Sequence, residues 1–103
     1  MKLIVSTLAL LSVTAVASAW KLDLYAGNRH VNFHGTRDSG CKNIAFTPPL
    51  NVNRAKFDPK TDWFPDPDTF ALYVNTDCRG LSYRNSGGDY ELAPRVIRSY
   101  KVE

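Results

Sequence analysis

The sequence predicts an all-β fold, a small antiparallel Greek-key sandwich of two similar motifs closed by one disulfide. Short segments alternate apolar and polar residues with a period of two, and no stretch of useful length has a helical period. Clusters of glycine, asparagine and proline separate these segments, as in antiparallel all-β domains. The features also repeat, because a Leu-Tyr pair at residues 24–25 recurs 48 residues later at residues 72–73. About eight short strands in two similar halves favour a sandwich.

A secretory leader is predicted for residues 1–19. A lysine precedes an apolar run, and Ala17 and Ala19 flank a serine in the small-residue pattern that signal peptidase cleaves. The apolar run is shorter than the roughly 20 residues that a membrane span requires, and no second run follows it. We therefore expect a secreted, extracellular protein without a transmembrane segment, with a single domain over residues 20–103.

Three short strands are predicted in the first motif, residues 20–57. Residues 20–26 alternate between apolar and polar side chains, which predicts a half-buried strand, and a Gly-Asn pair ends it with turn chemistry. Residues 30–34 alternate in the opposite sense, with Val and Phe inward and both histidines outward. A third strand is expected over residues 41–46, closed by two consecutive prolines that lack backbone donors.

An acidic, proline-rich connector, residues 58–69, separates the two motifs. Its three prolines and its turn-forming residues exclude a helix. Trp63 and Phe64 lie inside it, and we interpret them as a pair that packs back onto the core, because an exposed aromatic pair is costly. The alternative is an aromatic finger that contacts a ligand.

The second motif, residues 70–103, repeats the outline of the first. A strand is expected over residues 70–74, glycine turns follow it, and a closing strand is expected over residues 95–102. The inward positions of both motifs are expected to supply most of the core, namely Leu22, Leu24, Val31, Phe33, Ile44, Phe46, Phe70, Leu72, Val74, Leu92, Val96 and Val102.

Cys41 and Cys78 are the only cysteines, and each motif contains one of them. After the leader the chain has 84 residues, too few to bury an ample core without an additional constraint. In an exported chain, a single cysteine pair is typical of a disulfide, with two buried free thiols as the alternative. We predict a bridge that joins the two halves and stabilises the fold by about 4 kcal/mol in the chain-entropy description.

The two Leu-Tyr pairs, Gly80 and Ser99 mark a spacing of strands and turns that extends over nearly all of residues 20–103. This arrangement resembles the Greek-key domain of the βγ-crystallins, particularly its small secreted microbial versions, which include killer-toxin-like proteins and a metalloproteinase inhibitor. A short leader before an aromatic-rich domain with one cysteine pair is also similar to small secreted proteins of filamentous fungi, many of which are treated as candidate effectors.

The calcium site of the βγ-crystallins has paired Asn or Asp residues before a serine-containing element. The corresponding segments here are residues 51–56, which lack the serine, and residues 94–99, where Arg95 stands at a ligand position. Calcium requires several oxygen ligands at once, and a guanidinium repels it. Calcium binding of this type is therefore not expected.

His30 and His34 are the only histidines, and their four-residue spacing raises the question of a metal site. On a strand, four residues span about 13 Å, whereas zinc–nitrogen bonds are near 2 Å. We therefore interpret both as exposed strand residues and expect neither a metal site nor a cofactor.

No catalytic motif is present, and the sequence lacks a G-x-S-x-G element. The enzymatic alternative is a small secreted hydrolase, specifically a ribonuclease, which needs a carboxylate base, a histidine acid and a cation for the phosphate. Glu91, Arg95 and either histidine contain these groups, but nothing in their spacing places them together. The chain has 12 basic and 10 acidic residues after residue 19, a balance that does not indicate nucleic-acid binding.

The primary prediction is a secreted, non-catalytic interaction protein, effector-, toxin- or inhibitor-like, that acts through its surface on a host or competitor. Its expected partner is an extracellular protein or a cell-surface component. The candidate contact residues are aromatic and arginine side chains, namely Trp63, Phe64, Arg79, Arg84 and Arg98. A basic face is one hypothesis for Arg79, Arg84, Arg95, Arg98 and Lys101, and ordinary outward-facing charge that discourages edge pairing is the preferred one.

Overall fold

Eight β-strands form the regular structure in the computed structural model, which describes residues 19–59 and 67–103. In chain order they are β1 (Trp20–Ala26), β2 (Arg29–Gly35), β3 (Gly40–Asn43), β4 (Leu50–Asp58), β5 (Thr69–Tyr73), β6 (Leu81–Ser86), β7 (Gly88–Ile97) and β8 (Ser99–Val102). The predicted leader up to residue 18, and Trp63 and Phe64 in the connector, lie outside the described residues.

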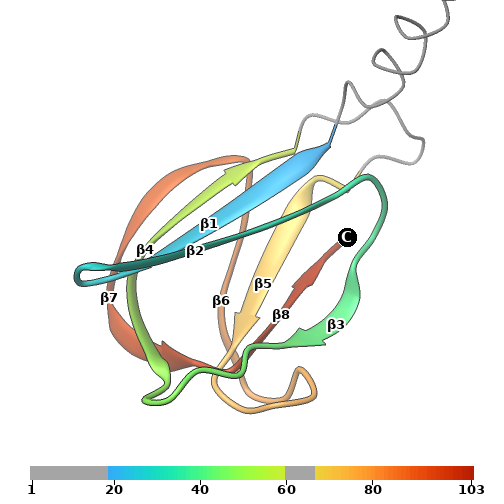
Figure 1. Ribbon diagram of the computed structural model, residues 1–103. Helices are drawn as coiled ribbons and strands as arrows, with labels where there is room; N and C mark the ends of the chain where they lie inside the picture. The colour runs from blue at the N-terminus through green and yellow to red at the C-terminus, as the bar shows by residue number, and fades with distance from the viewer. Residues whose placement is uncertain (1–18, 60–66) are drawn as a thin grey trace, which may run out of the picture.

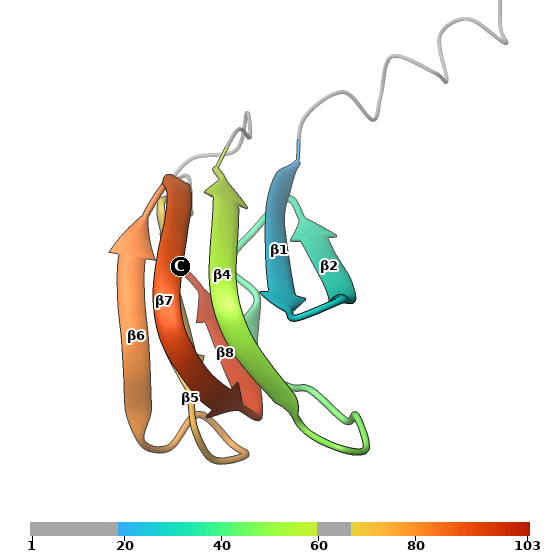
Figure 2. The same ribbon diagram turned by 90° about the vertical axis from the view of Figure 1, so that its left-hand side faces the viewer.

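The strands form two four-stranded antiparallel sheets that face each other as a sandwich (Figure 1). Sheet A has the order β2-β1-β4-β7 and sheet B the order β3-β8-β5-β6. Figure 2 shows sheet A in front, with β5 and β8 behind it. Each sheet takes three strands from one half of the chain and one from the other, because β7 joins sheet A and β3 joins sheet B. The prediction of an all-β sandwich is confirmed.

The alternation in the first two strands is confirmed residue by residue. Every second side chain of β1, beginning with Trp20, is buried, and the polar ones between them are partly or fully exposed. In β2 the side chains of Val31 and Phe33 are half-buried and pack on the core, while the two histidines are exposed. A two-residue turn joins the strands, and Gly27 adopts a φ of 66° there, which suits glycine.

A chain of aromatic rings crosses the core between the sheets. Trp20 and Phe57 lie 6.4 Å apart between ring centroids, Phe57 and Phe70 5.3 Å, and Phe70 lies 6.0 Å from Tyr83. The indole Nε1 of Trp20 donates a hydrogen bond to the carbonyl of Arg37 at 2.7 Å, so the polar edge of the ring is satisfied. Buried side chains absent from the predicted core are Trp20, Ala26, Leu50, Val52, Ala55, Phe57, Pro67, Ala71, Ile97, Ser99 and Tyr100.

The prediction that Phe46 and Val74 are core residues is wrong. Phe46 is 40% exposed, and the Arg29 guanidinium lies 5.6 Å from its ring centroid on the surface. Val74 is 36% exposed because the ladder between β5 and β6 shifts just before it and the chain leaves the sheet. Val96 is only half-buried, and its neighbour Ile97 takes the core position.

Two predicted strand boundaries also need correction. The third strand covers residues 40–43 rather than 41–46, because the bond from the Ile44 amide to the Arg98 carbonyl is its last contact with β8 and the chain then leaves the sheet. The predicted closing strand is divided at Arg98. Residue Ile97 pairs with β4 in sheet A, whereas the amide of Arg98 bonds to the carbonyl of Tyr73 in sheet B. The chain therefore changes sheets at this residue.

Truncation to alanine should lower the free energy of unfolding much more at a core residue than at a surface residue. Leu72 is fully buried, so Leu72→Ala is expected to lower the free energy of unfolding by about 2–5 kcal/mol. Phe46→Ala is expected to cost about 1 kcal/mol or less, the size of an exposed cation–π contact. Urea denaturation of both variants measures these values, and equal losses would contradict the burial described here.

Alkaline pH should destabilise the fold through Tyr100. Burial raises the pKa of Tyr100 above its ordinary value, and its ring stacks on Phe33 at 4.4 Å. The resulting stability is fully present below about pH 10, where unfolded tyrosine ionises, and is lost as the pH rises towards the folded-state pKa. We expect Tyr100→Phe to flatten the decline of Tm above pH 10, and an unchanged decline would contradict this assignment.

Candidate interaction surface

The segment between β5 and β6, residues 74–80, forms a tight loop. We call it the arginine loop because it carries Arg79. Two backbone hydrogen bonds close it, from the amide of Val74 to the carbonyl of Gly80 at 2.9 Å and from the amide of Asn75 to the carbonyl of Arg79 at 3.1 Å. Gly80 has a φ of 76°, and a Cβ there would lie 2.8 Å from the Val74 side chain, so glycine is required at this position.

Two consecutive non-glycine residues in the arginine loop have left-handed backbone conformations. The φ angles of Asp77 and Cys78 are 59° and 54°, a region that costs about 1–3 kcal/mol per non-glycine residue and persists only when the surroundings enforce it. Cys78 is bonded to Cys41, with 5.9 Å between their Cα atoms, which confirms the predicted disulfide. The side chain of Asn43 donates to Asp77 Oδ1 at 3.2 Å and accepts from the Asp77 amide at 2.8 Å.

The hydroxyl of Ser99, the first residue of β8, connects the arginine loop to sheet B. Ser99 is the one buried polar side chain within the described residues. Its hydroxyl donates to the carbonyl of Asn75 at 2.6 Å and accepts from the amide of Cys78 at 2.9 Å. Since a buried hydroxyl requires hydrogen-bond partners, these two bonds fix the loop in the position where both are made.

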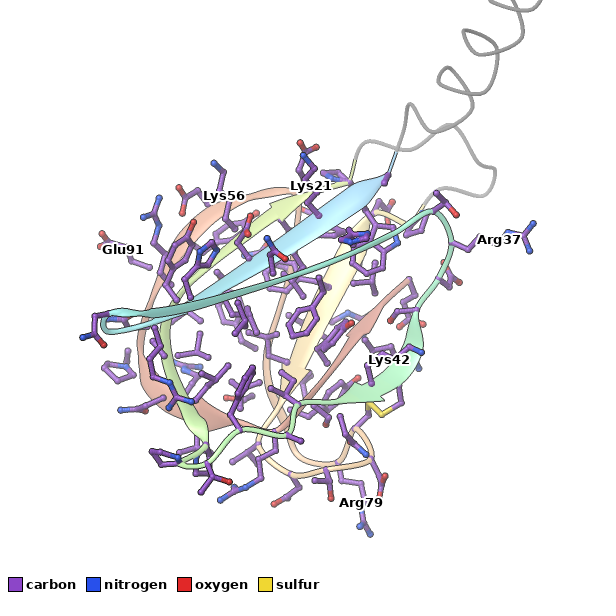
Figure 3. All side chains as sticks on the ribbon, in the orientation of Figure 1. Lys21, Arg37, Lys42, Lys56, Arg79 and Glu91 are labelled. Carbon is purple, nitrogen blue, oxygen red and sulfur yellow. A yellow bond between two sulfur atoms is a disulfide. The ribbon has the colours of Figure 1, made fainter. Side chains whose placement is uncertain are left out.

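The arginine loop presents charged and apolar side chains to solvent. The side chain of Arg79 is 74% exposed and points away from the sandwich (Figure 3), with the carboxylate of Asp77 3.7 Å from its guanidinium. Leu81 is 57% exposed, and Arg98 donates from Nη1 to the carbonyl of Val74 at 3.0 Å. Arginine is enriched among the residues that dominate binding energies at protein interfaces.

Arg84 lies away from this loop, on the outer face of sheet B. It shares a row with Lys101, on the other side of Ala71. One carboxylate, that of Glu103, lies 3.8 Å from the Arg84 guanidinium and 3.6 Å from the Lys101 ammonium. Arg84 and Lys101 therefore share one carboxylate on sheet B, which partly offsets their two positive charges.

A second polar cluster lies on the outer face of sheet A. The ring of Tyr25 is stacked on His30, with centroids 4.3 Å apart, and the Arg54 guanidinium lies 4.8 Å from the Tyr25 centroid. Arg54 donates to both carboxylate oxygens of Asp89 at 2.9 and 2.6 Å. These hydrogen bonds hold the pKa of Asp89 below its ordinary value and raise the pKa of Arg54. His30 Nε2 lies 3.0 Å from Asp23 Oδ1.

The three groups considered for hydrolysis are not brought together. His30 and Glu91 lie in one cross-strand row, but two strands separate β2 from β7, which places their backbones about 14 Å apart. The Arg95 guanidinium donates to the carbonyls of Ala93 and Ser82 at 2.8 and 3.0 Å, so it connects β7 to β6. Glu91 and Arg95 therefore do not face one phosphate-sized position together with a histidine.

Residues 19–59 and 67–103 contain no group of three or more metal-ligating side chains. His34 lies four residues along β2 from His30, and both are exposed on the same face. Asn51 and Asn53 of the first calcium-like segment lie in β4, and Arg95 of the second is engaged by backbone carbonyls. No helix within the described residues is long and apolar enough to cross a membrane.

Comparisons of the chain with protein-family models, with curated proteins and with solved structures found no match.

Arg79 and Arg98 were predicted as contact residues from the sequence, but the groups that hold them in place were not predicted. Asn43 and Asp77 are 34 residues apart, and no local pattern indicates their contact. Gly80 and Ser99 were singled out in the sequence only as positions that carry the resemblance to the βγ-crystallins, and not as residues that hold a loop.

Removal of the Ser99 hydroxyl should loosen the arginine loop. We expect Ser99→Ala to lower the free energy of unfolding by about 1–3 kcal/mol, because the Cys78 amide loses its acceptor inside the protein. Thermal denaturation measures this loss. Ser82→Ala serves as the control, since its side chain makes no hydrogen bond within the described residues, and equal losses in both variants would contradict the role of Ser99.

Proposed function

We propose that this protein is a secreted, non-catalytic interaction protein that binds an extracellular protein or cell-surface component of a host or competitor through its arginine loop. The observation that carries the proposal is the clamped conformation of this loop, in which Asp77 and Cys78 are held at positive φ by β3 and β8. Strained backbone that the surroundings enforce is concentrated at functional sites.

Preorganisation gives the loop a physical advantage in binding. Ordering a flexible loop on association costs free energy, and a loop already fixed by a disulfide and hydrogen bonds avoids that cost. Arginine is enriched among the residues that dominate interface energies, because its fork of donors matches carboxylates and its stem packs on apolar surface. We therefore infer a partner surface that places a carboxylate against Arg79 and an apolar contact against Leu81.

Secretion and the Greek-key classification are part of the same proposal. The predicted leader and the Cys41–Cys78 disulfide support export, since structural disulfides persist in oxidising compartments. The order β2-β1-β4-β7 becomes the order of sheet B when each strand is replaced by its equivalent in the other half. This equivalence supports two related Greek-key motifs and the resemblance to small secreted βγ-crystallin-like proteins.

The interaction role is favoured over the hydrolase alternative by the separation of the candidate catalytic groups. General acid–base catalysis requires both groups within hydrogen-bond reach of one substrate. His30 is instead occupied by Asp23 and Tyr25, about 14 Å from the backbone of Glu91.

The proposal is tested first by site-specific cross-linking. A photoreactive residue at position 81, beside the arginine loop, should capture a discrete partner from extracellular or cell-surface extracts. The same group at position 32, on the outer face of sheet A, should not capture it. Capture from position 32 alone would overturn the assignment of the surface.

The captured partner then allows a matched pair of substitutions. Arg79→Gln and Lys56→Gln each remove one exposed positive charge, the first from the arginine loop and the second from sheet A. Titration calorimetry should show binding weakened about tenfold by Arg79→Gln and less than about twofold by Lys56→Gln. Equal effects of the two variants would indicate general charge attraction and contradict the proposal.

A further inference from the structure

The outer face of sheet A is interrupted where β4 meets β7. The two strands pair regularly on both sides of Asn53, but opposite Asn53 strand β7 has three residues, 92–94, in place of one. Pro94 has no N–H and cannot continue the ladder. Irregularities of this kind bend a strand and re-aim its side chains.

Two adjacent depressions lie at this irregularity. The first has a volume of about 500 Å³, and Tyr25, Arg54 and Glu91 contribute to its lining. The second has a volume of about 430 Å³ and is lined by Pro48 and Pro49. Gly27, Asn53 and Pro94 line both, so we call the two together the Asn53 groove.

Two polar side chains of the Asn53 groove have no hydrogen-bond partner in the protein, and two others are held in place by their neighbours. Within the described residues, the carboxylate of Glu91 and the amide of Asn53 make no hydrogen bond or ion pair, and Figure 3 shows Glu91 pointing away from the sheet. Arg54 is fixed through Nε and Nη2 by Asp89, which leaves Nη1 available. The ring of Tyr25 is covered by His30 and Arg54, so its hydroxyl rather than its face is available to a ligand.

We propose that the Asn53 groove binds a neutral oligosaccharide. Sugar hydroxyls both donate and accept, which matches a site that combines an acceptor carboxylate, an amide with both functions and a guanidinium donor. The prolines of the second depression offer apolar surface to the C–H faces of pyranose rings. The carboxylate of Glu91 repels an acidic ligand. A basic ligand that approached Glu91 would be repelled by Arg54, which is the neighbour of Glu91 across the strands.

The Asn53 groove is separate from the arginine loop, so the sugar-binding proposal and the proposed function can fail independently.

Sugar binding is tested by NMR. The protein is expressed through a secretory route, so that the disulfide forms, and its amide resonances are followed. The probes are cellohexaose, laminarihexaose and chitohexaose at millimolar concentration, with oligolysine and a heparin hexasaccharide as charged comparisons. At least one neutral sugar should shift the amides of Gly27, Asn53 and Glu91, while Arg79→Gln leaves its affinity unchanged.

Glu91→Gln and Glu103→Gln form the matched pair of variants. Glu91 makes no hydrogen bond or ion pair within the described residues and is only attracted to Arg54 across the strands. Glu91→Gln should therefore change the Tm little while weakening sugar binding about tenfold, as for a lost hydrogen bond to a charged group. Glu103→Gln, on sheet B, should leave sugar binding unchanged. The proposal is overturned if no neutral sugar shifts these amides, if both variants weaken binding equally, or if oligolysine or heparin binds there more tightly.

Discussion

The covalent and hydrogen-bonded clamp between β3 and the arginine loop is the constraint on which the proposed function depends. The disulfide closes a separation of 37 residues, which in the chain-entropy description stabilises the fold by about 4 kcal/mol. Two left-handed residues in the loop cost about 1–3 kcal/mol each. The stabilisation by the disulfide is therefore large enough to offset the cost of these two residues. The hydrogen bonds of Asn43 and Ser99 then hold the arginine loop in one conformation.

The exchange of single strands between the halves explains where this clamp can form. All four residues of β3 are exposed, so this strand adds little apolar burial to sheet B. It pairs with β8 and brings Cys41 and Asn43, from the first half, beside a loop of the second half. In the opposite direction, β7 carries Glu91 and Pro94 into sheet A, where they shape the Asn53 groove. Each exchanged strand thus builds one of the two candidate binding surfaces.

Local features were predictable from the sequence, and long-range ones were not. The alternation of β1 and β2 needs only neighbouring residues, so their inward faces were predicted correctly. Phe46 and Val74 were misplaced because their exposure depends on where the chain leaves a sheet, and no alternation reveals the change of sheets at Arg98. Arg79 was predicted to be a contact residue from its residue type alone. The contact between Asn43 and Asp77, which helps to hold its loop, joins distant parts of the chain and was not predicted.

Amide hydrogen exchange of Asp77 and Cys78 tests the clamp most directly. Their amides donate to Asn43 Oδ1 and Ser99 Oγ in the clamped loop. In the oxidised protein both should exchange as slowly as sheet amides that open only with substantial unfolding, and after selective reduction of the disulfide both should exchange much faster while β1 keeps its protection. Rapid exchange at Asp77 and Cys78 in the oxidised protein would show a loop that is not preorganised and would contradict the account.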